Sequence, residues 1–158
     1  MSVQAIPKGY HTITPFMTVR DAARAIEFYK QAFGATEKGV MKGPEGKIMH
    51  AELVIGDSII MLADEFPEFG SLSPQSTGGS GTGLHIYIED VDSAFDRAVK
   101  AGATVEMPVA DMFWGDRYGK LRDPFGHKWS IGTHKADLSM EEMKKGMDEA
   151  LAKMPKSA

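Results

Sequence analysis

The sequence repeats one pattern twice, at an offset of 69 residues that places residues 14–32 over residues 83–101. Each copy begins with the alternating side chains of a strand and reaches an aspartate, Asp21 or Asp90, suited to capping a helix. An amphipathic helical pattern follows in both copies and ends at the tripeptide GAT, where glycine is a usual helix stop. A period this long predicts two supersecondary units and not a solenoid.

Three further strands are expected after each helix, which completes two copies of a βαβββ module. In the first copy, residues 47–55 and 57–64 flank a short hairpin signal at Gly56 and Asp57. In the second copy, residues 123–126 (DPFG) form a turn between two strand-like segments. The sequence therefore predicts an α+β fold in which two βαβββ modules form curved mixed sheets around a cavity.

The expected boundaries follow from the repeat and from local composition. We expect one domain over residues 1–158, with the first module at residues 10–64 and the second at residues 83–136. Residues 65–82 are rich in glycine, serine and proline, which predicts a linker. The two phenylalanines of this segment leave open a role as a lid.

Residues 137–158 predict a C-terminal amphipathic helix. Ser139 and Glu142 have the spacing of a capping box at its start. Apolar residues then recur at helical spacing, at Met140, Met143, Met147, Leu151 and Met154. Such a stripe needs an apolar surface to cover it, either in this subunit or in a partner.

Composition excludes several classes of partner. A net charge of -4 and no basic run longer than Lys144-Lys145 argue against nucleic acid. No window approaches the roughly 20 apolar residues of a membrane span, and the first residues carry no apolar leader, so we expect no membrane partner and a cytoplasmic protein. The absence of cysteine removes disulfides, thiolate metal sites and cysteine nucleophiles.

The alternation of side chains along a strand sorts the residues of each predicted sheet onto two faces. The apolar sets should pack on the helices; they include Met17, Val19, Ala51, Leu53, Leu84, Ile86, Trp129 and Ile131. The opposite faces carry polar and aromatic residues, among them Phe16, His50, Glu52, His85 and Tyr87. Such faces suit a concave ligand surface better than a dry core.

The segments TVRDAARAIEFYKQAFGA, DPFGHKW and FWGDRYGK resemble the vicinal oxygen chelate superfamily, which contains glyoxalases, extradiol dioxygenases and bleomycin-resistance proteins. The resemblance covers roughly residues 10–136, and residues 48–68 and 112–126 are similar to its PhnB-like branch. It is more specific for the fold than for an activity.

In metal-dependent members of that superfamily, the first and last strands of each module supply the metal ligands. The resemblance places those four positions at Thr14, Met61, Gly83 and Ser130, and none of these is a good metal ligand. We therefore expect no cofactor, and a divalent metal is disfavoured. A relocated metal site would draw on His50, Glu52 and His85.

The resemblance then implies a metal-independent protein that binds a small aromatic or cationic molecule and forms a homodimer. The expected ligand-binding residues are Phe16, His50, Glu52, Met61, His85, Tyr87, Phe113, Trp114, Asp116, Arg117 and Tyr118. The alternative is a metal-dependent glyoxalase-like lyase, isomerase or dioxygenase with a non-standard histidine and glutamate site, so we leave open whether the chain is an enzyme. A third reading is an interaction module that docks through the methionine-rich terminal helix.

Overall fold

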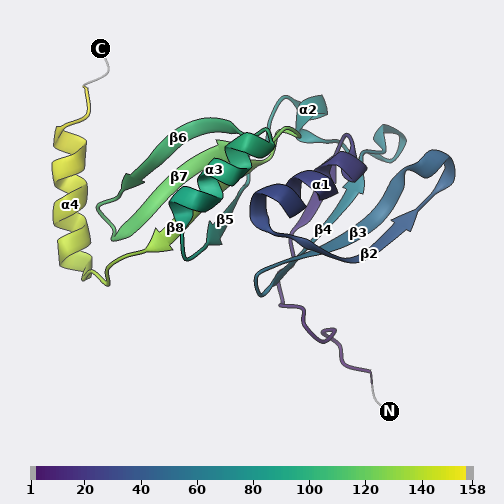
Figure 1. Ribbon diagram of the computed structural model, residues 1–158, viewed down its shortest axis with the longest axis horizontal. Helices are drawn as coiled ribbons and strands as arrows, with labels where there is room; N and C mark the ends of the chain where they lie inside the picture. Colours follow the sequence, from purple (N-terminus) through teal and green to yellow (C-terminus); the bar gives the residue numbers. More distant parts are fainter. Residues whose placement is uncertain (1–2, 156–158) are drawn as a thin grey trace.

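The computed structural model describes residues 3–155, which form two four-stranded sheets, each with one long helix on the same side (Figure 1). The first module consists of β1 (Phe16–Val19), α1 (Ala22–Phe33), β2 (Thr36–Lys42), β3 (Ile48–Ile55) and β4 (Ser58–Asp64). The second consists of β5 (Gly83–Tyr87), α3 (Val91–Ala101), β6 (Thr104–Asp111), β7 (Asp116–Arg122) and β8 (Lys128–His134). The predicted α+β fold of two βαβββ modules is confirmed.

Both sheets have the same topology. Their strand orders are β1-β4-β3-β2 and β5-β8-β7-β6, with the first and last strands of each module parallel and the other pairs antiparallel. Most of the residues that alternation assigned to the helix faces are buried, including Met17, Leu53, Trp129 and Ile131, whereas Leu84 and Ile86 are only partly buried. Each sheet therefore has one face beneath its helix and one face that its own module leaves uncovered, which we call the open face.

The capping aspartates begin the helices as the sequence predicts. Asp21 accepts a hydrogen bond from the backbone of Arg24, and Asp90 accepts one from the backbone of Ser93, each at 3.1 Å. The helices end at the glycines of the two GAT tripeptides, which adopt the positive φ values that favour glycine.

The repeat extends to a buried contact between each helix and the last strand of its module. In the first module, Oδ1 of Asp64 accepts a hydrogen bond from the backbone of Ala22 at 2.7 Å. In the second, Oγ1 of Thr133 accepts one from the backbone of Val91 at 2.9 Å. The two contacts occupy equivalent positions, since Thr133 follows Asp64 by 69 residues and Val91 follows Ala22 by 69 residues. Two different side chains thus accept the same backbone N–H at the start of each helix.

The two modules meet through their helices and through a cluster of aromatic rings. α1 packs on α3 (Figure 1), and the ring of Phe33 from α1 lies 4.7 Å, centroid to centroid, from that of Trp129 on β8. Tyr29 and Phe28 approach Phe125, which lies in the DPFG turn, at 6.4 and 6.2 Å. Residues of the second module are therefore part of the core beneath α1.

The segment between the modules is folded against the first module. It contains two single-turn 3-10 or α-helical elements, η2 (Pro67–Phe69) and α2 (Pro74–Thr77). Glu65 accepts hydrogen bonds from the backbone of Ser73 at 3.0 Å and from the hydroxyl of Ser76 at 2.7 Å. These bonds, led by the backbone one, lower the pKa of Glu65 to about 2. Phe69 is 81% exposed, so it does not cover a ligand cavity in this conformation.

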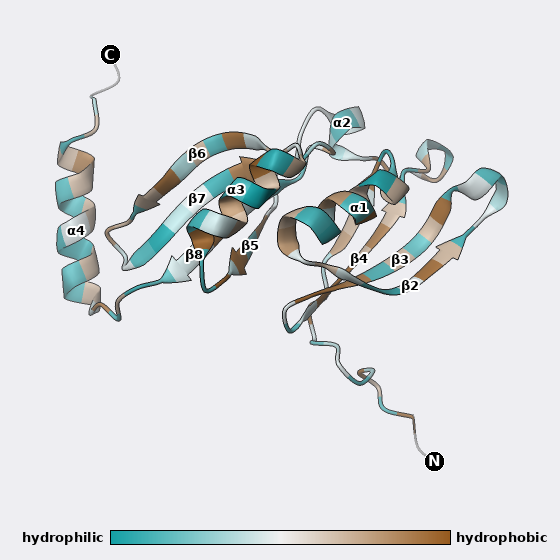
Figure 2. Cartoon of the chain, viewed as in Figure 1, coloured by the Kyte–Doolittle hydropathy of each residue, from teal (hydrophilic) through white to brown (hydrophobic). Residues whose placement is uncertain are grey.

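The C-terminal helix α4 (Met140–Ala152) begins at the predicted capping box of Ser139 and Glu142. It stands beside the second sheet, on the side away from the first module (Figure 2). At Gly146 the helix comes close to the second module, since a Cβ there would lie 2.8 Å from Phe113. The apolar stripe is largely open: Met140 and Leu151 are 77% and 55% exposed.

Among residues 3–155, no helix has the length and apolar character needed to cross a membrane.

Candidate functional site

The predicted site residues lie on two separate sheets and form two clusters. In the first module, Ala51 and Leu53 are fully buried beneath α1, which directs His50 and Glu52 to the open face. The ring of Phe16 stacks on that of His50 with 6.0 Å between centroids. Met61 pairs with Phe16 on one side and with Glu52 on the other. We call Phe16, His50, Glu52 and Met61 the first cluster.

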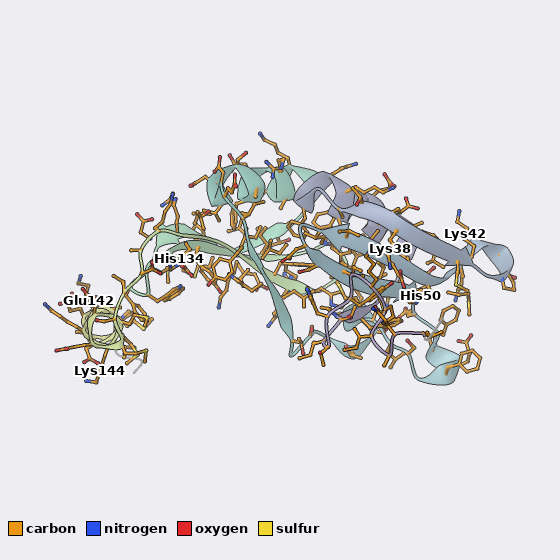
Figure 3. All side chains as sticks on the ribbon, turned by 90° about the horizontal axis from the view of Figure 1, so that it is seen from below. Lys38, Lys42, His50, His134, Glu142 and Lys144 are labelled. Atoms are coloured by element: carbon orange, nitrogen blue, oxygen red, sulfur yellow. The ribbon has the colours of Figure 1, made fainter. Side chains whose placement is uncertain are left out.

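Glu52 is the hub of the first cluster. It accepts a hydrogen bond from the hydroxyl of Tyr10, contacts Nζ of Lys38 at 3.3 Å, and lies 3.3 Å from Nε2 of His50. The bond from Tyr10, supported by His50 and Lys38, holds the pKa of Glu52 below its usual value despite burial. Sequence reasoning missed Tyr10 and Lys38, because neither belongs to the alternating pattern of the central strands. Figure 3 shows Lys38 and His50 on the same module.

The second cluster is a wall of rings on the open face of the second module, made by His85, Tyr87, Phe113, Trp114 and Tyr118. His85 meets Tyr87 edge to face at 4.4 Å and stacks on Tyr118 at 5.7 Å. Trp114 meets Tyr118 at 5.3 Å and Phe113 at 5.0 Å, both edge to face. These contacts join five predicted residues into one aromatic surface.

Asp116 lies behind this wall and is only 4% exposed. Its carboxylate accepts hydrogen bonds from Tyr87 at 3.1 Å, from Trp114 at 3.0 Å and from Nδ1 of His134 at 2.8 Å. Burial opposes its ionisation, but these three hydrogen bonds hold the pKa of Asp116 below its usual value. Asp116 therefore fixes two rings of the wall and has little capacity left for a direct bond to a ligand.

Arg117 does not join the second cluster. Its neighbour Gly119, which shares its side of β7, faces Phe95 of α3, so this side is the helix face of the sheet. The guanidinium binds Asp92 at 2.6 and 2.7 Å and Asp111 at 3.2 Å. From the sequence we expect Arg117 to bind the ligand, but alternation along β7 places it on the opposite face of the sheet from its neighbour Tyr118.

A cavity of about 590 Å³ opens between the two modules. Its walls are mostly apolar and include Ile13, Phe33, Ile60, Leu84, Ile86 and Trp129. His85 and Tyr87 belong both to this cavity and to the aromatic wall. Burial lowers the pKa of His85, which keeps its imidazole neutral at pH 7. The cavity thus pairs an apolar interior with a few polar groups at its border.

Of the four positions that the resemblance assigns to metal ligands, Thr14 and Ser130 carry hydroxyls, Met61 carries a thioether and Gly83 has no side chain. Ser130 pairs with His85, whose Nδ1 lies 2.8 Å from its hydroxyl, and Met61 pairs with Phe16. Within residues 3–155, no three histidine, aspartate or glutamate side chains gather closely enough to hold a metal ion, and this includes the relocated set of His50, Glu52 and His85.

Comparison with known proteins agrees with the fold. The model of the Glyoxalase/Bleomycin resistance protein/Dioxygenase superfamily matches residues 10–131. An uncharacterized protein of Mycobacterium tuberculosis (strain ATCC 25618 / H37Rv) is 44% identical over 138 residues, which are 85% of this chain and 81% of that protein.

Solved structures give the same result. The X-ray structure of a gene product of Arabidopsis thaliana matches with a TM-score of 0.63 and 28% identity, covering 77% of this chain and 98% of that one. TioX from Micromonospora sp. ML1 matches with a TM-score of 0.61 and 28% identity, over 78% and 98% of the two chains. A complex of the fosfomycin resistance protein FosX from Listeria monocytogenes with Mn(II) matches with a TM-score of 0.59 and 18% identity, over 84% and 93%, and shares the fold alone.

Proposed function

Because the chain belongs to the glyoxalase/bleomycin resistance protein/dioxygenase superfamily, we propose that it is a metal-independent protein that binds a small aromatic or cationic molecule between its two modules. The observation that carries this proposal is the cavity of about 590 Å³, with apolar walls that end at His85 and Tyr87. Cavities of roughly 300–1,000 Å³ with few polar groups are typical of small-molecule sites.

The aromatic wall supports an aromatic ligand. Ring pairs contribute about 0.5–1.5 kcal/mol each beyond the burial of apolar area, and the wall offers exposed rings such as Tyr87, which is 64% exposed. A cationic group would be attracted to the ring faces and to the charge of Asp116 behind them. His85 is neutral at pH 7 and does not oppose such a cation.

The side chains at the expected metal-ligand positions support binding without a metal. The resemblance assigns the four metal-ligand positions to Thr14, Met61, Gly83 and Ser130, and none of these is a good metal ligand. Lewis-acid chemistry needs several oxygen or nitrogen donors that converge on one ion.

We also propose that the protein is a homodimer. The open faces of the two sheets leave the rings of Phe16 and Tyr87 exposed, and the apolar stripe of α4 is also open. A second copy would cover these surfaces, and monomers rarely leave large apolar patches exposed. Light scattering at micromolar concentration tests this, and a monomer would overturn it. Removal of residues 138–158 would show whether α4 contributes to the dimer.

Membership of the PhnB-like branch and a cytoplasmic location stay predictions.

A panel of aromatic and cationic compounds tests the binding function by thermal shift and equilibrium dialysis. A ligand at 100 times its Kd stabilises the fold by about 2.7 kcal/mol. Trp114→Ala and the cavity-filling Ile86→Trp should each weaken binding at least tenfold, whereas Phe69→Ala, which removes an exposed ring of the linker, should not. Absence of saturable binding across the panel, or binding unaffected by both site variants, would refute the proposal.

A metal-dependent lyase, isomerase or dioxygenase is the second candidate, carried only by the close approach of His50 and Glu52. The FosX complex contains Mn(II), but its likeness to this chain extends to the fold alone. Metal analysis of protein purified without a histidine tag, before and after incubation with zinc, nickel, manganese or iron, separates the two candidates. Stoichiometric metal that is lost in His50→Ala would favour the enzyme.

A further inference from the structure

The segment from residue 3 to residue 15 crosses the open face of the first module, and we call it the N-terminal strap. It has no helix or strand, and its outward apolar side chains are exposed, with Ile13 at 85% and Ile6 at 50%. Figure 3 shows it passing the side of the sheet opposite to α1, near Lys38 and His50. At its end, the carbonyl of Pro15 accepts a 2.8 Å hydrogen bond from the backbone of Met61.

Tyr10 fastens the strap to the sheet. Its hydroxyl donates to Glu52 and accepts a hydrogen bond from Nζ of Lys38 at 2.5 Å. The same ammonium lies 3.9 Å from the centroid of the tyrosine ring, within the range of a cation–π contact. Glu52 thus accepts the proton of the phenol, while the ammonium of Lys38 both donates to its oxygen and lies against its ring.

The charges of this site are held in place by one another. The contacts to Tyr10 and Glu52 raise the pKa of Lys38, and the bond from Tyr10 lowers that of Glu52, so both groups are ionised at neutral pH. The carboxylate of Glu52 and the ammonium of Lys38 together bind a hydroxyl, which can both donate and accept a hydrogen bond. A hydrocarbon ring without a hydroxyl would be stabilised only by the burial of its apolar surface.

A cavity of about 550 Å³ lies between the strap and the sheet, beside this site. Its lining joins strap residues such as Ile6, Pro7 and Tyr10 to Lys38, Glu52 and Met61 of the sheet. The apolar part of this lining suits the ring of a ligand, and the polar part suits its hydroxyl.

We propose that Glu52 and Lys38 form a binding site for phenolic small molecules, which Tyr10 occupies in the free protein. A phenolic ligand competes with Tyr10 and releases the strap from the sheet. This site is separate from the aromatic wall of the second module, because it uses other residues and another cavity, so variants of Tyr10 and Glu52 test it separately from the proposed function.

Chemical rescue tests the proposal. Tyr10→Ala empties the phenol position, and p-cresol should then raise the melting temperature of this variant saturably, while toluene, which lacks the hydroxyl, should raise it little. The wild-type protein should bind p-cresol at least tenfold more weakly than Tyr10→Ala, since the tethered Tyr10 competes. The double variant Tyr10→Ala with Glu52→Gln should lose most of the rescue.

Two further measurements keep the test decisive if Tyr10→Ala folds poorly. Tyr10→Phe keeps the ring and removes the hydroxyl, and it should bind p-cresol more tightly than the wild type does. In the wild type, saturating p-cresol should speed proteolysis within residues 3–15. Equal effects of p-cresol and toluene, equal affinity of the wild type and the Tyr10 variants, or rescue that survives Glu52→Gln would each overturn the phenol site.

Discussion

The hydroxyl of Tyr29, in the first module, donates a 2.7 Å hydrogen bond to Oδ2 of Asp123, in the second. The same carboxylate accepts the indole N–H of Trp129 at 2.8 Å and the backbone N–H groups of Phe125 and His127 at 2.9 Å. Burial and the neighbouring carboxylate raise the pKa of Tyr29 well above its usual value. One buried aspartate thus closes the DPFG turn and joins the modules.

Removing either partner should destabilise the fold. Tyr29→Phe should lower the free energy of unfolding by about 1.5–3 kcal/mol, the range for a hydrogen bond to a charged group. Asp123→Ala should cost more, because several buried donors lose their acceptor. Urea unfolding measures both. Tyr118→Phe is a matched control, since the Tyr118 hydroxyl makes no hydrogen bond to the described residues; an equal loss in the control would contradict the prediction.

Thr133→Val should destabilise the second module with little change of shape. The hydroxyl of Thr133 accepts from the backbone of Val91 and donates to the carbonyl of Ile88 at 2.8 Å, and the residue is 8% exposed. Leaving a buried donor unpaired costs about 1–3 kcal/mol. Thermal unfolding should show this loss for Thr133→Val, and not for the same change at the exposed Thr36. An unchanged melting temperature would mean that water replaces the hydroxyl.

The pair of His134 and Asp116 predicts a pH dependence. Hydrogen bonds to Asp116 and then Asp137 raise the pKa of His134 above the value of about 6.5 that it has in an unfolded chain. The stabilisation is therefore complete below about pH 6.5 and is lost as the pH rises through the higher folded pKa. NMR titration should show His134 titrating above His85, whose pKa burial lowers. In Asp116→Asn the pKa of His134 should fall; an unchanged value would contradict the pairing.

Gly146→Ala should loosen α4 instead of stabilising it. Alanine normally favours a helix interior by about 1 kcal/mol over glycine. Here the added carbon would lie 2.8 Å from Cβ of Phe113 and 3.3 Å from its carbonyl oxygen, so the helix must shift. Limited proteolysis after residue 137 should be faster, and the fluorescence of Trp114, next to Phe113, should change. A higher melting temperature with unchanged proteolysis would show that the approach is not tight.

The fold was predictable from the sequence because its signals are local and occur twice. Asp21 and Asp90 cap the helices, the GAT glycines end them, and alternation assigned Trp129 to the core. The partners of Trp129 were not predictable, since Tyr29 and Phe33 come from the other module and no local pattern specifies how two modules meet.

The site was harder to predict than the fold. Alternation found the aromatic wall, but it could not show that the hydrogen-bonding capacity of Asp116 is used within the protein by Tyr87, Trp114 and His134. It also grouped both clusters into one surface, whereas the structure distributes them over two sheets. Tyr10 lies outside any periodic segment, so only the folded chain brings it to Glu52.

The N-terminal strap is a shared wall, because His11 and Thr14 line both the cavity between the modules and the cavity beside Glu52. We therefore expect a molecule that moves the strap at one cavity to change the free energy of binding at the other. By thermodynamic linkage this coupling is reciprocal: whatever factor the first ligand imposes on the affinity for the second, the second imposes on the first. The binding of one small molecule could therefore depend on the concentration of a chemically different one, through the thirteen residues of the strap.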